Sequence, residues 1–559
     1  MALKWDVFSG VAPALTKWKL PRNMAQTAQN VNLDSSTIKP WKDAITVLSG
    51  VSAAATTTIF RFGRALVSDV IYWFTWAFDV DVVKGPIIGD VTERTFYTGD
   101  GAPKWTDATL ATAGGPPYPA GFRLLGVPRP INAPTVTVSG TAASNDYSVV
   151  GYAYTHVSPY GEESAPSPIS AGVKVYSGQT AYISGMDAAL TGAQSTSARR
   201  IYRSVSFSVN NGLYFVKEVA ITGGPFADDV GANIGEVIQT TSWTPPPSNG
   251  FGLTAMANGI LIMFSGNDIW ASAQYAPYAW PVAFKMATDY PIIGGRAIGN
   301  QCVVLTMGSP YMVTGTSPSS LTASKIETPE ACVSKRSIVN ITATMPSMMG
   351  PNVAIGTVFF ASQNGLCAID SGGTCKVITE GLLNREDWQA LIPTSIQGYV
   401  YNGKYFGFFN TGSSTGGFCF DPRGGRSALS FFNFNATGGF FDLVQDHMHL
   451  QVGSSIVLWN SAATSMTSTW RSGIVGLDRA VTFAYAEVLA ASYANVTFKL
   501  YGDGVLVWSQ TVLDRRPFRV PGDDAYFQWE VEISTTSEVY EVTLAHNGAD
   551  LSHAAQQEA

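Results

Sequence analysis

The chain has 559 residues, a net charge of −7 and a pI near 5.3, and only 13% of its residues are charged. Tight nucleic-acid binding needs clustered Lys and Arg to neutralise phosphates, and the sequence has no basic run, so that class is disfavoured. The polar but weakly charged surface suits a protein that packs against neighbours over much of its area, because charges are costly to bury at interfaces.

The pattern along the chain predicts an all-β fold. Short runs rich in Val, Ile, Tyr, Phe and Trp, such as "YSVVGYAYTHV" and "GTVFFASQNGLCAID", alternate with turn clusters containing Gly, Asn and Asp. Strands repeat at the spacing of sandwiches and propeller blades. We expect a β-propeller-like core with an inserted fibronectin-III-like sandwich and a small C-terminal β-sandwich. The best helix candidate is "GLLNREDWQAL", residues 381–391, which opens with acids near its start.

Two proline-rich segments suggest the domain boundaries. Residues 1–131 read as an N-terminal β segment that contributes to the propeller, and the linker at its end, residues 124–135, carries Pro128, Pro130 and Pro134. Residues 132–247 read as the inserted sandwich, which ends in "TTSWTPPPSNG". Residues 248–463 are the predicted main propeller-like domain, and residues 464–559 the C-terminal sandwich.

The chain start "MALKWDVFSGVAPAL" lacks a long apolar stretch after a basic end, and no apolar run reaches the roughly 18 residues of a membrane helix. We therefore expect neither a signal peptide nor a membrane span. The five cysteines are irregularly spaced, which disfavours structural zinc, and we expect them to be reduced and buried. Cys367 and Cys375 flank a predicted hairpin turn and could lie opposite each other.

The segment "HVSPYGEESAPSP", residues 156–168, raises the question of catalysis because His156 stands near Glu162 and Glu163. Adjacent residues of an extended chain point to opposite sides, whereas a catalytic carboxylate pair must converge on one substrate. We therefore interpret this segment as a solvated turn of the sandwich, and His156 as a surface or half-buried residue at a strand end.

Other chemical motifs are weak. The sequence has no nucleophile elbow, no phosphate-binding loop, and no third ligand that we can name for His447, His449 and the nearby Asp446. "TGDGAPKW", residues 98–105, is a single near miss to the Asp box that sialidases repeat, and "ARRIYRS" reads as a strand with outward arginines. The many Trp and Tyr residues could form sugar-stacking platforms, but most are expected to fill cores. We expect no catalytic, cofactor-binding or metal-binding residues and no enzymatic activity.

Several stretches together resemble the nozzle, or tail tubular protein B, family of short-tailed bacteriophages. They are "NMAQTAQNVNLDSSTIKPWK" (23–42), "RTFYTGDGAPKWTD" (94–107), "VSPYGEESAPSP", "RRIYRS", "WTPPPSNGFGLTAMANGILIMFSGNDIWAS" (243–272), "YAWPVAF" (278–284), "TPEACVSKRSIV" (328–339) and "ITEGLLNREDWQALIP" (378–393). The likeness spans most of the chain, although no single motif is diagnostic.

The resemblance implies a virion structural protein of the phage tail, assembled in the host cytoplasm. Such proteins form a hexameric ring below the portal and adaptor, line the channel through which double-stranded DNA leaves, and bear the tail fibres. A net negative charge fits a channel along which DNA slides without sticking. A mobile gate loop is expected in "TMPSMMGPNVAIG", which contains Met345, Met348 and Met349, because methionine adapts to changing neighbours. The alternatives are a propeller glycosidase and a sugar-binding receptor protein.

Overall fold

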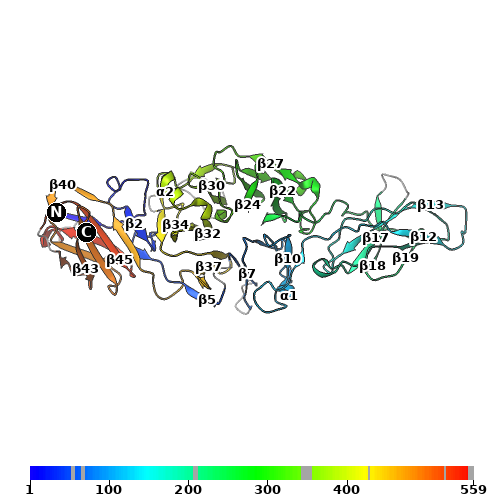
Figure 1. The fold of residues 1–559 in the computed structure, drawn as a ribbon, viewed down its shortest axis with the longest axis horizontal. Helices are drawn as coiled ribbons and strands as arrows, with labels where there is room; N and C mark the ends of the chain where they lie inside the picture. The colour runs from blue at the N-terminus through cyan, green and yellow to red at the C-terminus, as the bar shows by residue number, and fades with distance from the viewer. Residues whose placement is uncertain are drawn as a thin grey trace. The chain divides into compact units, whose positions relative to one another are not determined.

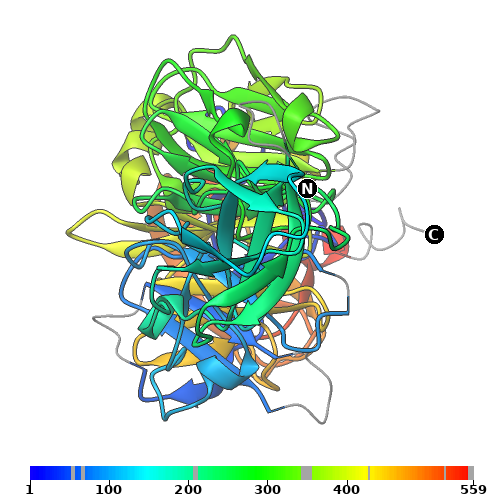
Figure 2. The same ribbon diagram turned by 90° about the vertical axis from the view of Figure 1, so that its right-hand side faces the viewer.

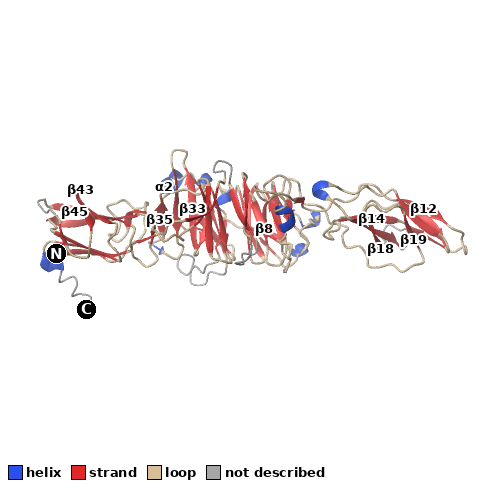
Figure 3. Cartoon of the chain, turned by 90° about the horizontal axis from the view of Figure 1, so that it is seen from below, coloured by secondary structure: helices blue, strands red, loops and turns tan. Residues whose placement is uncertain are grey.

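The computed structural model describes residues 1–51, 57–63, 70–87, 89–205, 212–341, 356–425, 428–520 and 524–551. Nearly all of its regular structure is β-strand, as Figure 3 shows. Within the described residues the α-helices are two short ones, α1 (Ala108–Ala111) and α2 (Arg385–Ala390). The predicted all-β, propeller-like fold class is therefore confirmed.

The chain divides into two compact units. Unit 1 consists of Met1–Phe78, Val303–Met312 and Lys325–Ala559, and unit 2 consists of Asp79–Cys302 and Val313–Ser324.

Unit 2 contains two four-stranded sheets whose strands follow each other in the chain, which is the pattern of a propeller blade. The first comprises β8 (Asp81–Lys84), β9 (Thr95–Thr98), β10 (Lys104–Thr106) and β11 (Arg123–Leu124). The second comprises β20 (Phe251–Ala255), β21 (Leu261–Ser265), β22 (Asp268–Ala271) and β23 (Met286–Ala287). Buried Phe96 and Trp105 of the first sheet and Leu253 and Met263 of the second belong to one hydrophobic core.

The inserted sandwich of unit 2 is built from three small sheets, whose strands run from cyan to green in Figures 1 and 2. They comprise β12 (Thr135–Ser139) with β16 (Thr180–Ser184) and β19 (Phe226–Asp229); β13 (Tyr147–Val150) with β15 (Val173–Tyr176); and β14 (Tyr152–Val157) with β17 (Ala198–Ser204) and β18 (Leu213–Ala220). Tyr152, Tyr154 and Ile201 form the centre of the core, and none of them is exposed.

Further four-stranded sheets follow along the chain, again in the blade pattern. They comprise β24 (Ile292–Ile298), β25 (Gln301–Thr306), β26 (Tyr311–Thr314) and β27 (Thr322–Lys325), then β28 (Val339–Ile341), β29 (Thr357–Ala361), β30 (Leu366–Asp370) and β31 (Cys375–Val377). Next are β32 (Gln397–Tyr401), β33 (Lys404–Asn410), β34 (Thr415–Phe420) and β35 (Leu429–Phe432).

A blade of unit 1 combines one early strand of the chain with three strands that follow almost four hundred residues later. The strands β36 (Gly438–Asp442), β37 (His447–Val452) and β38 (Ser455–Leu458) are completed by β5 (Ile45–Ser49), which pairs with β38 as the outermost strand. The hairpin β6 (Thr58–Phe62) and β7 (Tyr72–Trp76) packs nearby, with Phe60 in edge contact with Phe440.

The C-terminal sandwich of unit 1 also includes N-terminal strands. One sheet comprises β1 (Ala2–Trp5), β46 (Val539–Ala545), β41 (Tyr485–Ala490) and β44 (Phe518–Arg519). The facing strands are β2 (Ala25–Gln29), β39 (Ser468–Ser472), β40 (Val475–Val481), β42 (Val496–Gly502), β43 (Val505–Val512) and β45 (Tyr526–Thr535). Strand β2 also pairs with β35, so the sheet continues into a blade, and the short hairpin β3 (Val31–Asn32) and β4 (Lys39–Pro40) follows β2. The sequence places residues 1–131 with the propeller, whereas β1 lies against β46, with Ala2 opposite Ala545.

The predicted helix at residues 381–391 is present but begins later. Helix α2 starts after Asn384, whose side chain caps it by accepting a hydrogen bond from the Asp387 amide at 2.8 Å. Glu386 and Asp387 occupy the first turn, where negative charge is favoured. Trp388 is fully buried and donates from Nε1 to the Ser362 carbonyl at 2.8 Å, which anchors the helix to the end of β29.

Candidate functional site

The loop at residues 156–168 is not the solvated turn that the sequence predicts. Glu162 and Glu163 are only 4% and 6% exposed, and His156 is also buried. The two carboxylates have different partners: Arg94, just before β9, binds Glu162, and Arg200 of β17 binds Glu163, as expected for neighbours that point to opposite sides. The expectation of solvation was wrong because the partners of these acids lie far away in the sequence.

Glu162 joins the sandwich to the first blade of unit 2. Its carboxylate lies 3.0 Å from Nη1 of Arg94, and Asp90 lies 3.2 Å from Nε of the same arginine. Tyr160 reinforces this contact: its hydroxyl donates to Asp107 at 2.5 Å, and its ring meets Trp105 edge-on. Burial raises the pKa of Glu162 from 4.5 to about 7, although Arg94 opposes that shift.

Glu163 is held inside the sandwich by three donors. Its carboxylate accepts hydrogen bonds from Arg200 at 2.6 Å, Tyr202 at 2.6 Å and Thr155 at 2.7 Å. A carboxylate bonded to three fixed donors is a poor general base, since proton uptake would break these contacts. Glu163 therefore serves as a wall of the neighbouring groove rather than as a proton-transfer group.

That groove is a cavity of about 590 Å³ on unit 2. Its lining includes the aromatic residues Tyr202, Phe215, Trp243 and Tyr278. The rings of Trp243 and Tyr278 pack edge-to-face with their centres 5.5 Å apart. The rings of Tyr202 and Phe215 pack in the same way with their centres 5.9 Å apart. Aromatic surface combined with a few fixed polar groups is the usual composition of a small-molecule site.

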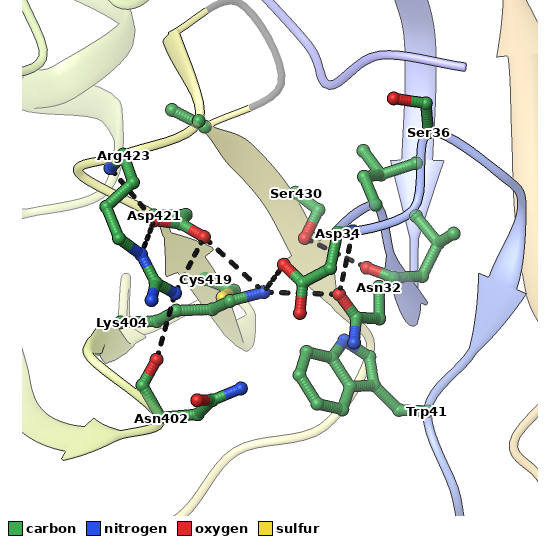
Figure 4. A pocket seen from close by; sticks show the side chains of 14 residues that line it. Asn32, Asp34, Ser36, Trp41, Asn402, Lys404, Cys419, Asp421, Arg423 and Ser430 are labelled. Atoms are coloured by element: carbon green, nitrogen blue, oxygen red, sulfur yellow. Dashed lines mark hydrogen bonds and ion pairs between the residues drawn. The ribbon is translucent and has the colours of Figure 1, made fainter. Parts of the chain in front are cut away.

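A second cavity, of about 440 Å³, lies in unit 1 and is centred on Lys404 (Figure 4). Lys404 begins β33 and its side chain is only 3% exposed. The ammonium group contacts the carboxylate of Asp34, Oδ1 of Asn32 at 3.1 Å and Oδ2 of Asp421 at 3.6 Å. It also lies 5.4 Å from the centre of the Trp41 ring, which adds a cation–π contact.

Arg423 completes the charge balance of this cavity. Its guanidinium group binds Asp421 through two hydrogen bonds, of 3.0 and 3.2 Å, and donates to the Asn402 carbonyl at 3.0 Å. Two cations therefore face two carboxylates. Because each ionic group is already paired, the arrangement suits a contact that holds residues 32–34 against the β33–β34 hairpin.

The histidines do not form a metal centre. His447 and His449 share one face of β37, as predicted, with ring centres 6.2 Å apart. His449 is buried against Trp73 at 4.8 Å, and burial lowers its pKa to about 4. Among the residues that the structure describes, no group of three His, Cys, Asp or Glu side chains could hold a metal ion.

The arginines of "ARRIYRS" do not all point outward. Arg199 and Arg203 are each 5% exposed, and Arg203 forms an ion pair with buried Asp228 at 2.7 Å. Only Arg200 reaches the surface in part. The prediction of outward charges was wrong because Asp228, 25 residues away, supplies a buried counter-charge. "TGDGAPKW" is the turn between β9 and β10, in which Lys104 binds Asp100 at 2.8 Å.

The five cysteines carry free thiols, and all but the half-buried Cys375 are buried. Cys367 lies opposite Val377 and Cys375 opposite Ile369, so the two cysteines are diagonal neighbours rather than a directly facing pair. Burial raises the pKa of the Cys302, Cys332 and Cys419 thiols to about 12, which makes them poor nucleophiles.

The predicted gate residues Met345, Met348 and Met349 lie outside the described residues. Within the described ranges, none of the helices has the length and apolar character to cross a membrane. The two ion-paired clusters, Glu162 with Arg94 and Lys404 with Asp34, were not identified as such from the sequence. Arg94, Glu162 and Asp34 fall within stretches quoted for the family resemblance, whereas Lys404 lies outside them.

No family model matches this sequence, and no curated protein matches it. Among solved structures, the chain is similar to the extracellular domain of a two-component system from B. thetaiotaomicron, with 10% identity, a TM-score of 0.25, and coverage of 69% of this chain and 47% of that one. It spans about half the length of that structure. It is similar to virginiamycin B lyase from Staphylococcus aureus, with 10% identity, a TM-score of 0.25, and coverage of 58% of this chain and 99% of that one. It is similar to a dihydro-heme d1 dehydrogenase, with 10% identity, a TM-score of 0.24, and coverage of 67% of this chain and 74% of that one.

Proposed function

We propose that this chain is a structural protein of a bacteriophage tail, a nozzle subunit that forms a ring with copies of itself, six by the family resemblance. The ring lies below the portal or adaptor protein, lines the DNA exit channel and attaches tail fibres, and the chain has no enzymatic activity. Its location is the virion, after assembly in the host cytoplasm.

The observation that carries this proposal is the exposed edge strand β5. All five of its residues are exposed, including Ile45 at 47% and Val47 at 43%. An outermost strand with apolar side chains invites pairing with another chain unless a partner covers it. A neighbouring copy in a closed ring would cover this strand, and rotational symmetry would repeat the contact around the ring.

The charged clusters support the same proposal. Arg94–Glu162, Arg203–Asp228 and Lys404–Asp34 are internal pairs that fasten one segment of the chain to another. Such groups stabilise one arrangement of the segments and are not directed at a substrate. This use of charge suits a subunit that must keep its shape within an assembly.

Native mass spectrometry of the purified full chain, together with a low-resolution map of the virion, tests the proposal. We expect a closed assembly of several copies, and we expect Val47→Lys to shift it toward monomers because the substitution places a charge at the contact. Val91→Lys in unit 2, where Val91 is 81% exposed outside any strand, is the matched control and should leave the assembly intact. A chain that stays monomeric at every concentration and is absent from phage particles would exclude the ring.

A second candidate function is a sugar-binding receptor protein of the tail, and the aromatic groove of unit 2 favours it. A propeller glycosidase is the remaining alternative, and it predicts hydrolysis of host polysaccharide by the isolated chain. In the groove, Glu163 and Glu218 are both bound to Arg200, at 2.6 and 2.9 Å, so neither is an unpaired acid or base. Reducing-end release from host polysaccharide, measured over hours, would separate hydrolysis from binding.

A further inference from the structure

We propose that the unit 2 groove lined by Tyr202, Phe215, Trp243 and Tyr278 binds a neutral saccharide. The volume of about 590 Å³ falls within the roughly 300–1,000 Å³ typical of ligand sites. This inference rests on the second candidate function, a sugar-binding protein, and specifies its class of sugar; it does not depend on ring assembly.

The aromatic wall supplies the apolar part of the recognition. Phe215, Trp243 and Tyr278 are half-buried, so each residue keeps accessible surface, while Tyr202 is buried and contacts the Phe215 ring. Sugar rings present C–H groups on their faces, and these groups pack against aromatic rings through apolar contact. Aromatic residues provide such contact at low entropic cost, because few bonds must be immobilised.

The backbone fixes these rings in place. Thr244, next to Trp243, both accepts from the Trp280 amide at 2.8 Å and donates from its hydroxyl to the Trp280 carbonyl at 2.7 Å. These bonds hold the Trp243 segment beside the Tyr278 segment. On the other wall, Phe215 exchanges backbone hydrogen bonds with Gly235 and Glu236 at 2.7 and 2.9 Å. The groove is therefore preformed, which lowers the entropic cost of binding.

The polar groups match hydroxyls rather than charges. Arg200 lies between Glu163 and Glu218, which are bound by Nη1 and Nε of its guanidinium group. Glu218 is 46% exposed and Arg200 is 32% exposed, so both can reach a ligand. Carboxylate oxygens accept hydrogen bonds from hydroxyl groups, and a guanidinium group donates to hydroxyl oxygens.

The charge of the lining determines which class of sugar fits. Three carboxylates, those of Glu163, Glu218 and Glu236, face one guanidinium group, that of Arg200. An acidic sugar such as a sialic or uronic acid would bring another negative charge into this excess and be repelled. A neutral hexose or N-acetylhexosamine oligomer avoids that cost.

Isothermal titration calorimetry of the full chain against matched neutral and acidic oligosaccharides tests the proposal. The probes are glucose, galactose and N-acetylglucosamine oligomers, with polysialic and polygalacturonic oligomers as acidic counterparts. We expect at least one neutral series to bind with millimolar or better affinity and the acidic series to bind more weakly. Absence of binding by every neutral oligomer, or tighter binding of the acidic series, would overturn the proposal.

Three variants locate the binding site. Trp243→Ala should weaken binding about tenfold, the size expected when one aromatic contact is lost. Glu218→Gln, at an exposed position that should not affect folding, should narrow the preference for neutral over acidic oligomers. Tyr147→Ala removes a 50% exposed ring from the same sandwich outside the groove and should leave the affinity for oligosaccharides unchanged.

If Tyr147→Ala weakens binding as much as Trp243→Ala, or if Glu218→Gln leaves the preference for neutral oligomers unchanged, the groove is not the site. The mass measurement of ring assembly is independent of all three results.

Discussion

Glu162 in unit 2 and Lys404 in unit 1 are both buried charged residues, yet they are stabilised differently. Glu162 has a single basic partner, Arg94, and burial raises its pKa to about 7. Lys404 has two carboxylate partners, Asp34 and Asp421, as well as an amide oxygen and an aromatic ring. A buried charge must therefore be considered together with its partners before any catalytic role is assigned to it.

The largest effect is expected at Lys404. Replacing it in Lys404→Met would leave Asp34 and Asp421 without their shared cation, and breaking a buried pair in this way costs about 3–5 kcal/mol. The lower part of that range is expected, because Asp34 is 41% exposed and water can replace part of the lost contact. The midpoint of urea unfolding measures the loss.

Lys285→Met is the matched control for Lys404→Met. Lys285 pairs with Asp268 at 3.1 Å, but both side chains are about one-third exposed. An exposed pair of this kind contributes about 0–1 kcal/mol. Equal losses in the two variants would show that the burial of Lys404 has no energetic consequence.

A smaller, pH-dependent effect is expected for Arg94→Met. The variant leaves Glu162 buried without its cation, but the acid can avoid the cost by taking up a proton. We expect a loss of about 2 kcal/mol near pH 7, which grows toward pH 9 as protonation becomes harder. Unfolding curves at pH 6 and pH 9 check this result, and a loss that does not change with pH would contradict it.

The smallest effect per unit of pH is a slope in the pH dependence of stability that Glu162→Gln should remove. The pKa of Glu162 is about 7 in the folded state, above its ordinary value of 4.5, which we take for the unfolded chain. Between these pH values the folded state therefore binds more protons than the unfolded state. Glu162 therefore stabilises the fold less as pH rises from 4.5 to 7, by at most about 1.4 kcal/mol per pH unit.

Unfolding free energies of the wild type and Glu162→Gln, measured in steps across that range, test the sign. The variant should gain stability relative to the wild type as pH rises toward 7. Above pH 7 the difference between the two unfolding free energies should stay constant. Parallel curves across the whole range would contradict the raised pKa of Glu162.

The sequence predicted the fold class because alternating apolar residues and turn clusters are local signals, as in β29 and β30. It predicted that Glu162 and Glu163 point to opposite sides, because backbone alternation is local as well. It did not predict their burial, since Arg94 lies 68 residues from Glu162. Local sequence patterns could not predict the ion pair of Lys404 either, because its partner Asp34 is 370 residues away. Pairing between distant segments decides whether a charged residue is buried, and one sequence alone contains no direct record of that pairing.

The ladder between β1 and β46 also determines when the protein can finish folding. Ala2 is made more than five hundred residues before its partner Ala545. Most of unit 2 is one continuous stretch, Asp79–Cys302, and can fold during translation. Unit 1 cannot be completed before β46 is made, so a chain that stops short of β46 would lack the strand that pairs with both β1 and β41.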